Sequence, residues 1–107
     1  MKSKNETVVD NSKPRLSLLN PKFVTGTIMA MMTGVDKYEE GDYLNGHKLS
    51  KYYDKVGRHI LAFWGGEDDD PESKLNHLYH AAADLHIMID ILSRKPEHDD
   101  RPHKCKP

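Results

Sequence analysis

LNHLYHAAADLHIMIDIL, residues 75–92, carries a strong helical period. Its apolar positions follow one another at alternating intervals of three and four: Leu75, Leu78, Ala82, Leu85, Ile89 and Leu92. This spacing places them on one side of an amphipathic α-helix, the side expected to pack against the rest of the protein. Pro71 suits a first helical turn, so we expect the helix to begin near Asp70 or Ser73. It should end around Ser93.

Two further helices are expected upstream. The first begins near Pro21, runs through FVTGTIMAMMTG and stops at Gly34, after which residues 35–46 read as a loop rich in turn signals. The second begins at Ser50, an N-cap candidate, and ends at Gly65. Its apolar stripe contains Tyr53, Val56, Ile60 and Trp64. No segment alternates as a strand would, so the sequence predicts an all-α fold, a small bundle of about three main helices.

The size of the chain limits its core. It has 107 residues, of which 36% are hydrophobic, and the apolar ones gather in the middle of the sequence. We therefore expect one helical domain over residues 14–93, between a flexible arm at 1–13 and a flexible tail at 94–107. A domain of this size buries little surface and is often stabilised by a partner chain, so we expect a homo-oligomer.

Charge and cysteine content exclude several classes of function. The net charge is −1, with 16 basic and 17 acidic residues, which leaves no basic surface for duplex nucleic acid. No apolar run is long enough to cross a membrane, and the first residues do not resemble a secretory signal. Cys105 is the single cysteine, so an intrachain disulfide is excluded. These features fit a cytoplasmic protein.

A polar stripe accompanies the apolar face of the third expected helix. Ser73, His77, His80 and Asp84 fall within about 60° of one another around the helix axis. Apolar residues continue this side toward the C-terminus: Ile87, Met88 and Ile91. The stripe is either half-exposed surface, or the polar end of a second packed face where imidazoles and a carboxylate converge on one ion or phosphate.

Four consecutive acids, Glu67 to Asp70, precede this helix. Their mutual repulsion would be relieved by a divalent cation, and oxygen-rich ligand sets suit Mg²⁺ or Mn²⁺. Alternatively, the acids complement the helix dipole. On the second helix, Arg58 is either half of a surface ion pair with Asp54 or a guanidinium available to phosphate oxygens.

Three segments together resemble a known group of bacteriophage proteins. They are KPRLSLL (13–19), TGVDKY (33–38) and KYYDKVGRHILAFWGGEDDDPESKLNHLYHAAADL (51–85). In this order they are similar to the N-terminal type of dATP/dGTP diphosphohydrolase, a group proposed to be related to the all-α MazG-like nucleotide pyrophosphohydrolases. The resemblance covers about residues 13–92, and its RH, GED, DPES and HLxHAA elements are fairly specific.

The resemblance implies that a metal-activated water attacks a nucleoside triphosphate, dATP or dGTP, and releases monophosphate and pyrophosphate. The roles that it implies are a metal set of Glu67, Asp70 and Asp84 holding Mg²⁺ or Mn²⁺; substrate contacts by Lys37, Tyr38 and Arg58; and catalytic imidazoles at His59, His77 and His80. One departure is clear. MazG-like enzymes carry EExxE, whereas here Glu39 and Glu40 are followed by Tyr43 in place of the third acid.

Two other functions compete with this hydrolase. One is a non-catalytic helical protein of a phage that binds a host factor. The small core and the charged arms favour this function. The other is a nucleotide-binding regulator without turnover. If the chain is phage-encoded, the cytoplasm is that of the host.

Overall fold

The computed structural model describes residues 12–103 and 105. Its three α-helices are α1 (Pro21–Lys37), α2 (Leu49–Trp64) and α3 (His77–Arg94), and its short 3-10 turns are η2 (Leu16–Leu18), η3 (Asp42–Leu44) and η4 (Pro96–His98). The described residues form no strand, only an isolated bridge between Asp69 and Asn76. The predicted all-α fold with three main helices is confirmed.

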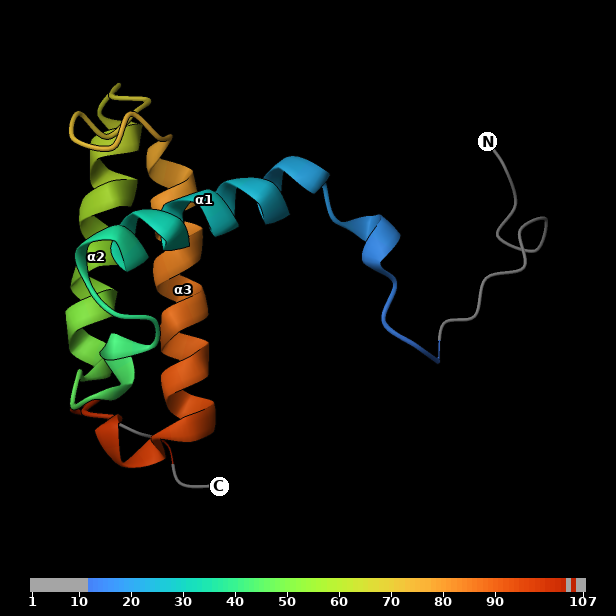
Figure 1. The fold of residues 1–107 in the computed structure, drawn as a ribbon. Coiled ribbons are helices and arrows are strands. Elements are labelled where there is room, and N and C mark those ends of the chain that lie inside the picture. The colour runs from blue at the N-terminus through green and yellow to red at the C-terminus, as the bar shows by residue number, and fades with distance from the viewer. Residues whose placement is uncertain (1–11, 104, 106–107) are drawn as a thin grey trace.

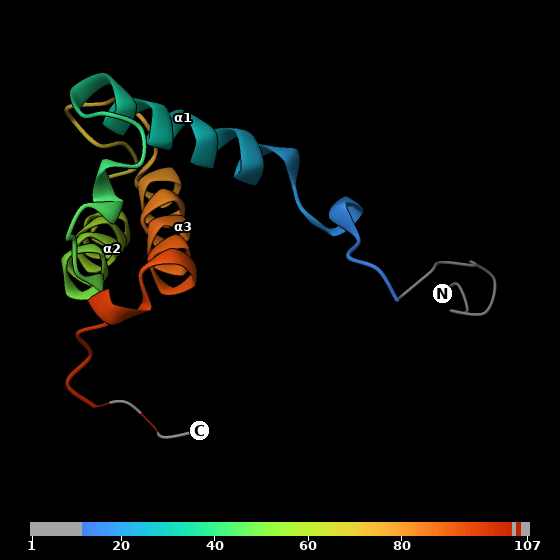
Figure 2. The ribbon, with the colours of Figure 1, turned by 60° about the horizontal axis from the view of Figure 1, so that its bottom comes forward.

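Helices α2 and α3 form an antiparallel pair joined by residues 65–76, and α1 crosses this pair near the joining loop (Figure 1). The start of α1, where residues 21–25 are exposed, and η2 extend away from the pair in both views (Figure 2). At the opposite end, η4 follows α3 and leads back toward the start of α2. The side chain and backbone N–H of Ser50 both donate to the carboxylate of Asp100, at 2.5 and 3.0 Å. Part of the segment expected to be a flexible tail therefore contacts α2.

The observed helix bounds correct three expectations. Helix α1 passes Gly34, the expected stop, and ends only at Lys37. Helix α2 begins at Leu49, so Ser50 is not its N-cap. Helix α3 begins at His77, because residues 69–76 form a turn and the side chain of Asn76 caps the helix by accepting from the N–H of Leu78 at 2.8 Å. The expected start near Asp70 or Ser73 is wrong for that reason.

The buried face of α3 is not the leucine face that the sequence predicted. Leu78, Leu85, Ile89 and Leu92 are 42–66% exposed, whereas the opposite side contains the buried His77, Ala81, Ala83, Asp84 and Ile91. Small alanines allow neighbouring helices to approach closely, which explains why this side is chosen. The expected stripe of α2 is also largely outside, with Tyr53, Ile60 and Trp64 exposed. Among the described helices, none has the length and apolarity that a membrane span requires.

The apolar core lies between α2 and α3 at the η3 end. Leu49, Tyr52 and Ile91 are buried there, and partly buried apolar residues surround them: Tyr43, Leu44, Ile87 and Met88. The prediction that Ile87, Met88 and Ile91 continue the polar stripe as a packed surface is thus confirmed.

Helix α1 is attached to α3 through a glycine. A Cβ atom on Gly26 would lie 2.3 Å from a ring carbon of Tyr79, far closer than van der Waals contact permits. Gly26 and Ala30 are the buried residues of α1, so the two helices meet across small side chains. These contacts hold the middle of α1 beside the loop end of the pair.

Candidate functional site

The loop between α2 and α3 folds back over the first turn of α3. The backbone N–H of His77 donates to the carbonyl of Asp68 at 2.9 Å, and the N–H of Asp70 donates to the carbonyl of Leu75 at 2.8 Å. Gly66 has a φ of +109° and Lys74 a φ of +66°, the left-handed conformations that reverse the chain at either side of the acids. The backbone of the acidic turn is therefore folded against α3, while Glu67, Asp68 and Asp69 are exposed to solvent.

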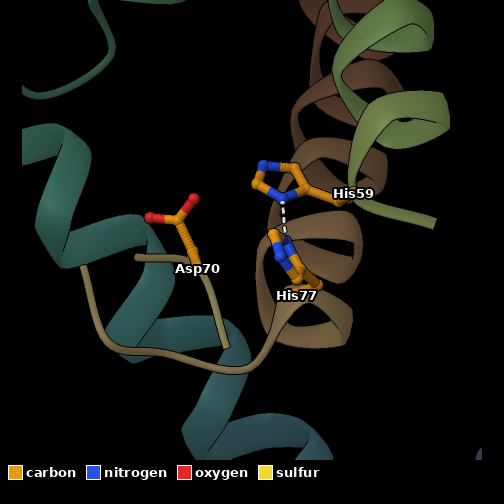
Figure 3. Close-up of side chains that lie close together, drawn as sticks. All are labelled: His59, Asp70 and His77. Carbon is orange, nitrogen blue, oxygen red and sulfur yellow. Dashed lines mark hydrogen bonds between the residues drawn. The ribbon is translucent and has the colours of Figure 1, made fainter. Parts of the chain in front are cut away.

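Three histidines from two helices meet under this loop. The Nδ1 atoms of His59 on α2 and His77 on α3 are 2.8 Å apart, and Figure 3 shows these two rings joined, with Asp70 apart from them on the neighbouring loop. The ring of His80 stacks on that of His59, with centroids 4.9 Å apart and planes 12° apart. In the sequence analysis, these three histidines were grouped only because the family resemblance implied a shared role. In the structure, the ring of His59 contacts both of the others.

The buried ring of His77 is oriented by a carboxylate. Its Nε2 lies 2.6 Å from Oε1 of Glu67, while the Glu67 side chain remains half exposed. A carboxylate accepts, so we assign the proton to Nε2 of His77. In the neutral ring this leaves the lone pair on Nδ1, directed at His59.

The loop carboxylate Asp70 and His80 share a partner in Ser73. The N–H of Ser73 donates to Oδ2 of Asp70 at 2.9 Å, and the Ser73 hydroxyl lies 2.6 Å from Nε2 of His80. Burial opposes ionisation of Asp70, yet the hydrogen bonds from Ser73 and the nearby imidazoles His80 and His59 lower its pKa below the ordinary value. Asp70 is therefore an anion at neutral pH.

His59 and His80 are kept neutral. Burial lowers the pKa of each below the ordinary value for histidine, and the other imidazoles of the cluster lower it further. A neutral imidazole offers one nitrogen lone pair to a proton or a metal ion. Ligand atoms of His59, Asp70 and His77 all lie within 4.8 Å of one another, so this group has the arrangement of a metal-binding set.

A cavity of about 520 Å³ opens beside the histidines, between α1, the loop at 38–47, α2 and α3. One wall is cationic and comes from α2: Lys51, Lys55 and Arg58. Aromatic residues line the cavity as well: Tyr38, Tyr43, His47 and Tyr52. A second hollow of about 440 Å³ adjoins it over the acidic loop, and the two share Tyr38, Lys55, His59 and His80. Both volumes lie in the range of small-molecule sites.

The structure brings some predicted site residues together and separates others. The larger cavity is lined by four of them: Arg58, His59, His80 and Asp84. Tyr38 borders both hollows, and 63% of its surface is exposed. Lys37 forms an exposed ion pair with Glu72 and lines only the smaller hollow. Asp84 is buried, near Lys55 and Arg58, and burial raises its pKa to about 6. Neither Asp84 nor Glu67 belongs to the metal-binding set, so of the three expected metal ligands that set contains Asp70.

Two lysines of the cationic wall were missed by the sequence prediction. Lys51 and Lys55 precede Arg58 by seven and three residues, so the three cations share one face of α2. That spacing was available in the sequence. The expected apolar stripe of α2 concealed it, because the exposed side was taken for the packed side.

Known proteins identify the family. The family model described as "dATP/dGTP diphosphohydrolase, N-terminal" matches residues 3–101. A protein of Salmonella phage PMBT28 named dATP/dGTP diphosphohydrolase is 34% identical over 92 residues, which are 86% of this chain and 31% of that relative. The chain thus spans about a third of the relative's length, and no solved structure matches it. The chain belongs to the dATP/dGTP diphosphohydrolase N-terminal family.

Proposed function

We propose that the chain is a divalent-metal-dependent nucleoside triphosphate diphosphohydrolase that converts a deoxynucleoside triphosphate, dATP or dGTP, into the monophosphate and pyrophosphate. One observation carries the proposal: the cationic face of α2 runs along a nucleotide-sized cavity and ends at a cluster of neutral imidazoles and an ionised carboxylate. The name of the phage relative supports the same reaction.

The cationic wall suits the triphosphate. Lys51, Lys55 and Arg58 would neutralise its charge, and the planar guanidinium of Arg58 can donate two parallel hydrogen bonds to phosphate oxygens. Tyr38, exposed at the mouth shared by both hollows, is positioned to stack on the base. Lys37 already pairs with Glu72 and would contact substrate only from the smaller hollow.

The histidine cluster suits the chemical step. Water attacks the α-phosphorus, the new P–O bond forms, and the bond to the β-phosphate oxygen breaks. His80 is neutral and can accept the proton of the attacking water, while Ser73 holds its ring. Mg²⁺ or Mn²⁺ held at Asp70 would supply charge neutralisation and a lowered pKa of bound water. The donors fit a divalent ion, because a carboxylate oxygen and two imidazole nitrogens lie within 4.8 Å of one another.

Turnover by the full chain tests the proposal. Purified protein is incubated with each deoxynucleoside triphosphate and Mg²⁺ or Mn²⁺, and monophosphate and pyrophosphate are quantified by chromatography. Arg58→Ala should lower kcat/KM at least tenfold through lost phosphate contacts, whereas Lys48→Ala, an exposed lysine outside both cavities, should leave it unchanged. Absence of turnover with every nucleotide would overturn the proposal. Binding without turnover would then favour a regulator, and capture of a host partner in place of nucleotide would favour an interaction protein.

The predicted homo-oligomer and the cytoplasmic location remain proposals. The exposed apolar side chains of α2 and α3, among them Trp64 and Ile89, are the surfaces that a second copy would cover. Sedimentation equilibrium of the same preparation measures the oligomeric state independently of turnover.

A further inference from the structure

We infer that His59, His77 and Asp70 form a site for a divalent transition-metal ion, such as Co²⁺ or Zn²⁺, that discriminates against Mg²⁺. The ligands are Nδ1 of His59, Nδ1 of His77 and one carboxylate oxygen of Asp70. A role of this ion in hydrolysis rests on the proposed function. The site itself rests on geometry alone.

The contact between His59 and His77 requires a cation or a proton. Two ring nitrogens 2.8 Å apart cannot both direct lone pairs at each other, since nothing would offset their repulsion. One proton on Nδ1 of His59 satisfies the pair. A metal ion takes the place of that proton when both lone pairs turn toward one point beside the line that joins them, because two nitrogens at about 2.1 Å from one ion and at the right angle of octahedral coordination are about 3 Å apart. The observed separation therefore matches adjacent ligands of one ion.

Glu67 prepares His77 for this role. Ligating histidines usually donate the other ring N–H to a carboxylate, which fixes the tautomer and raises the basicity of the ligating nitrogen. Here Nε2 of His77 meets Glu67 at 2.6 Å, so Nδ1 is the free nitrogen and points at His59. Glu67 thus acts behind the metal and not on it, which differs from the role that the family resemblance implied.

Asp70 supplies the third ligand from a separate segment. One of its carboxylate oxygens lies within 4.8 Å of a ring nitrogen of His59 and of His77, and the N–H of Ser73 donates to its Oδ2. The ligands come from α2, the loop and α3, so an ion would join the three segments. Three protein ligands leave coordination positions open, and His59 borders both hollows, from which water or phosphate can enter.

The donor set decides which metal is preferred. Mg²⁺ favours oxygen ligands and retains its waters, and Mn²⁺ also suits oxygen ligands, whereas imidazole suits Zn²⁺ and binds Co²⁺ more tightly than Mn²⁺. Two imidazoles and one carboxylate therefore favour the transition metals. The negative charges of Asp70 and, behind His77, of Glu67 favour any divalent cation without altering that preference.

Metal binding is tested on the full chain without nucleotide. EDTA-treated, dialysed protein is titrated calorimetrically with Mn²⁺, Co²⁺, Zn²⁺ and Mg²⁺, and the Co²⁺ complex is followed by its visible absorption. We expect one site per chain, with Co²⁺ and Zn²⁺ bound at least 100-fold more tightly than Mg²⁺. His59→Ala and His77→Ala should each weaken Co²⁺ binding at least 100-fold, and Glu67→Gln about tenfold.

Matched controls separate this site from other donors. His86 is exposed on α3, away from the cluster, so His86→Ala should leave the affinity unchanged. The double variant His103→Ala/Cys105→Ser removes donors near the C-terminus and should also leave it unchanged. Circular dichroism verifies that each variant is folded. If a histidine variant fails to fold, the ¹⁵N shifts of the wild-type rings with and without Zn²⁺ show whether the Nδ1 atoms of His59 and His77 bind the ion.

Two results would overturn the inference: no stoichiometric site for any transition metal, or a site of equal affinity after removal of either histidine. The proposed function fails separately. Tight Co²⁺ binding without turnover of any nucleotide removes the hydrolase and retains the metal site, whereas full Mg²⁺-dependent turnover by His77→Ala retains the hydrolase and removes this ion from its mechanism.

Discussion

The seam between α2 and α3 has a buried residue of α3 at each end, and the two ends differ in chemistry. At the η3 end, Ile91 is 0% exposed among Leu49 and Tyr52. At the loop end, His77 is 4% exposed and contacts His59 and Glu67. Burial of an aliphatic side chain stabilises the fold by roughly 1.5–3 kcal/mol, whereas burial of a polar ring stabilises it little unless every polar atom finds a partner.

Polar groups are placed differently at the two ends. At the η3 end they lie at the rim, where the hydroxyl of Tyr43 donates to Asp90 at 2.5 Å and Asp90 also pairs with Arg94. At the loop end the polar groups occupy the centre, and each imidazole is partnered by a carboxylate, a hydroxyl or another imidazole. We therefore expect the η3 end to supply most of the free energy of unfolding, and the loop end to hold the polar side chains of the candidate site in fixed positions.

The largest expected effect is that of Ile91→Ala at the apolar end. Removal of the most buried side chain leaves a cavity between α2 and α3, and the free energy of unfolding should fall by about 2–4 kcal/mol. Urea denaturation measures this loss. His77→Ala at the loop end should cost less stability and abolish Co²⁺ binding. An equal loss of stability in both variants would contradict the division of roles between the two ends.

A second comparison concerns two glycines of α1. Gly26→Ala places a methyl group on the ring of Tyr79, 2.3 Å away at one carbon, and should lower the free energy of unfolding by about 1–3 kcal/mol as α1 is displaced from α3. Gly34→Ala is the matched control, because nothing lies within 4 Å of its added Cβ. Gly34 lies in the last turn of α1, where the helix preference for alanine is weaker than in mid-helix, so that change should stabilise the protein by at most about 0.5–1 kcal/mol. Thermal melts of both variants test whether Gly26 is needed for packing, a conclusion that equal effects would refute.

The helices could be predicted from the sequence because their signals are local. Pro21 lies at the first turn of α1, as predicted, and the hydrophobic period of residues 75–92 identifies α3. The start of α3 could not be placed, since the turn at 69–76 is closed by a bridge between Asp69 and Asn76. That pairing depends on the folded loop and leaves no mark on the period of the sequence.

The larger error was the prediction of which side of α3 packs against the other helices, and this error has a physical cause. A hydrophobic period identifies the most apolar face, but Ala81 and Ala83 allow closer helix contact than Leu78 or Leu85. The polar stripe therefore faces inward, and with it the histidines. His77 and His80 could be proposed from their spacing on α3. Their contact with His59 depends on how α2 and α3 pack, which the spacing within one helix does not specify.

Asp84 lies between the two ends, and its expected effect is the smallest. Burial raises the pKa of this carboxyl from 3.8 to about 6, against the opposing attraction of Lys55 and Arg58 on α2. Between these two values the folded chain binds more protons than the unfolded chain, so the free energy of unfolding falls as the pH rises. The cost of the buried charge is fully present above pH 6 and absent below about pH 4.

Asp84→Asn removes that cost, together with the interaction by which Asp84 raises the pKa of Lys55 and of Tyr52. The unfolding free energy of Asp84→Asn minus that of the wild type should be about 1–2 kcal/mol larger at pH 7.5 than at pH 4. This is less than the energy that corresponds to the full pKa shift, because the site borders a hydrated cavity. Urea titrations at both pH values measure the difference, and Asp36→Asn, on the exposed side of α1, provides the control. A pH-independent difference would mean that Asp84 is hydrated like a surface acid. The seam would then be open to water up to its middle, and only its η3 end would count as core.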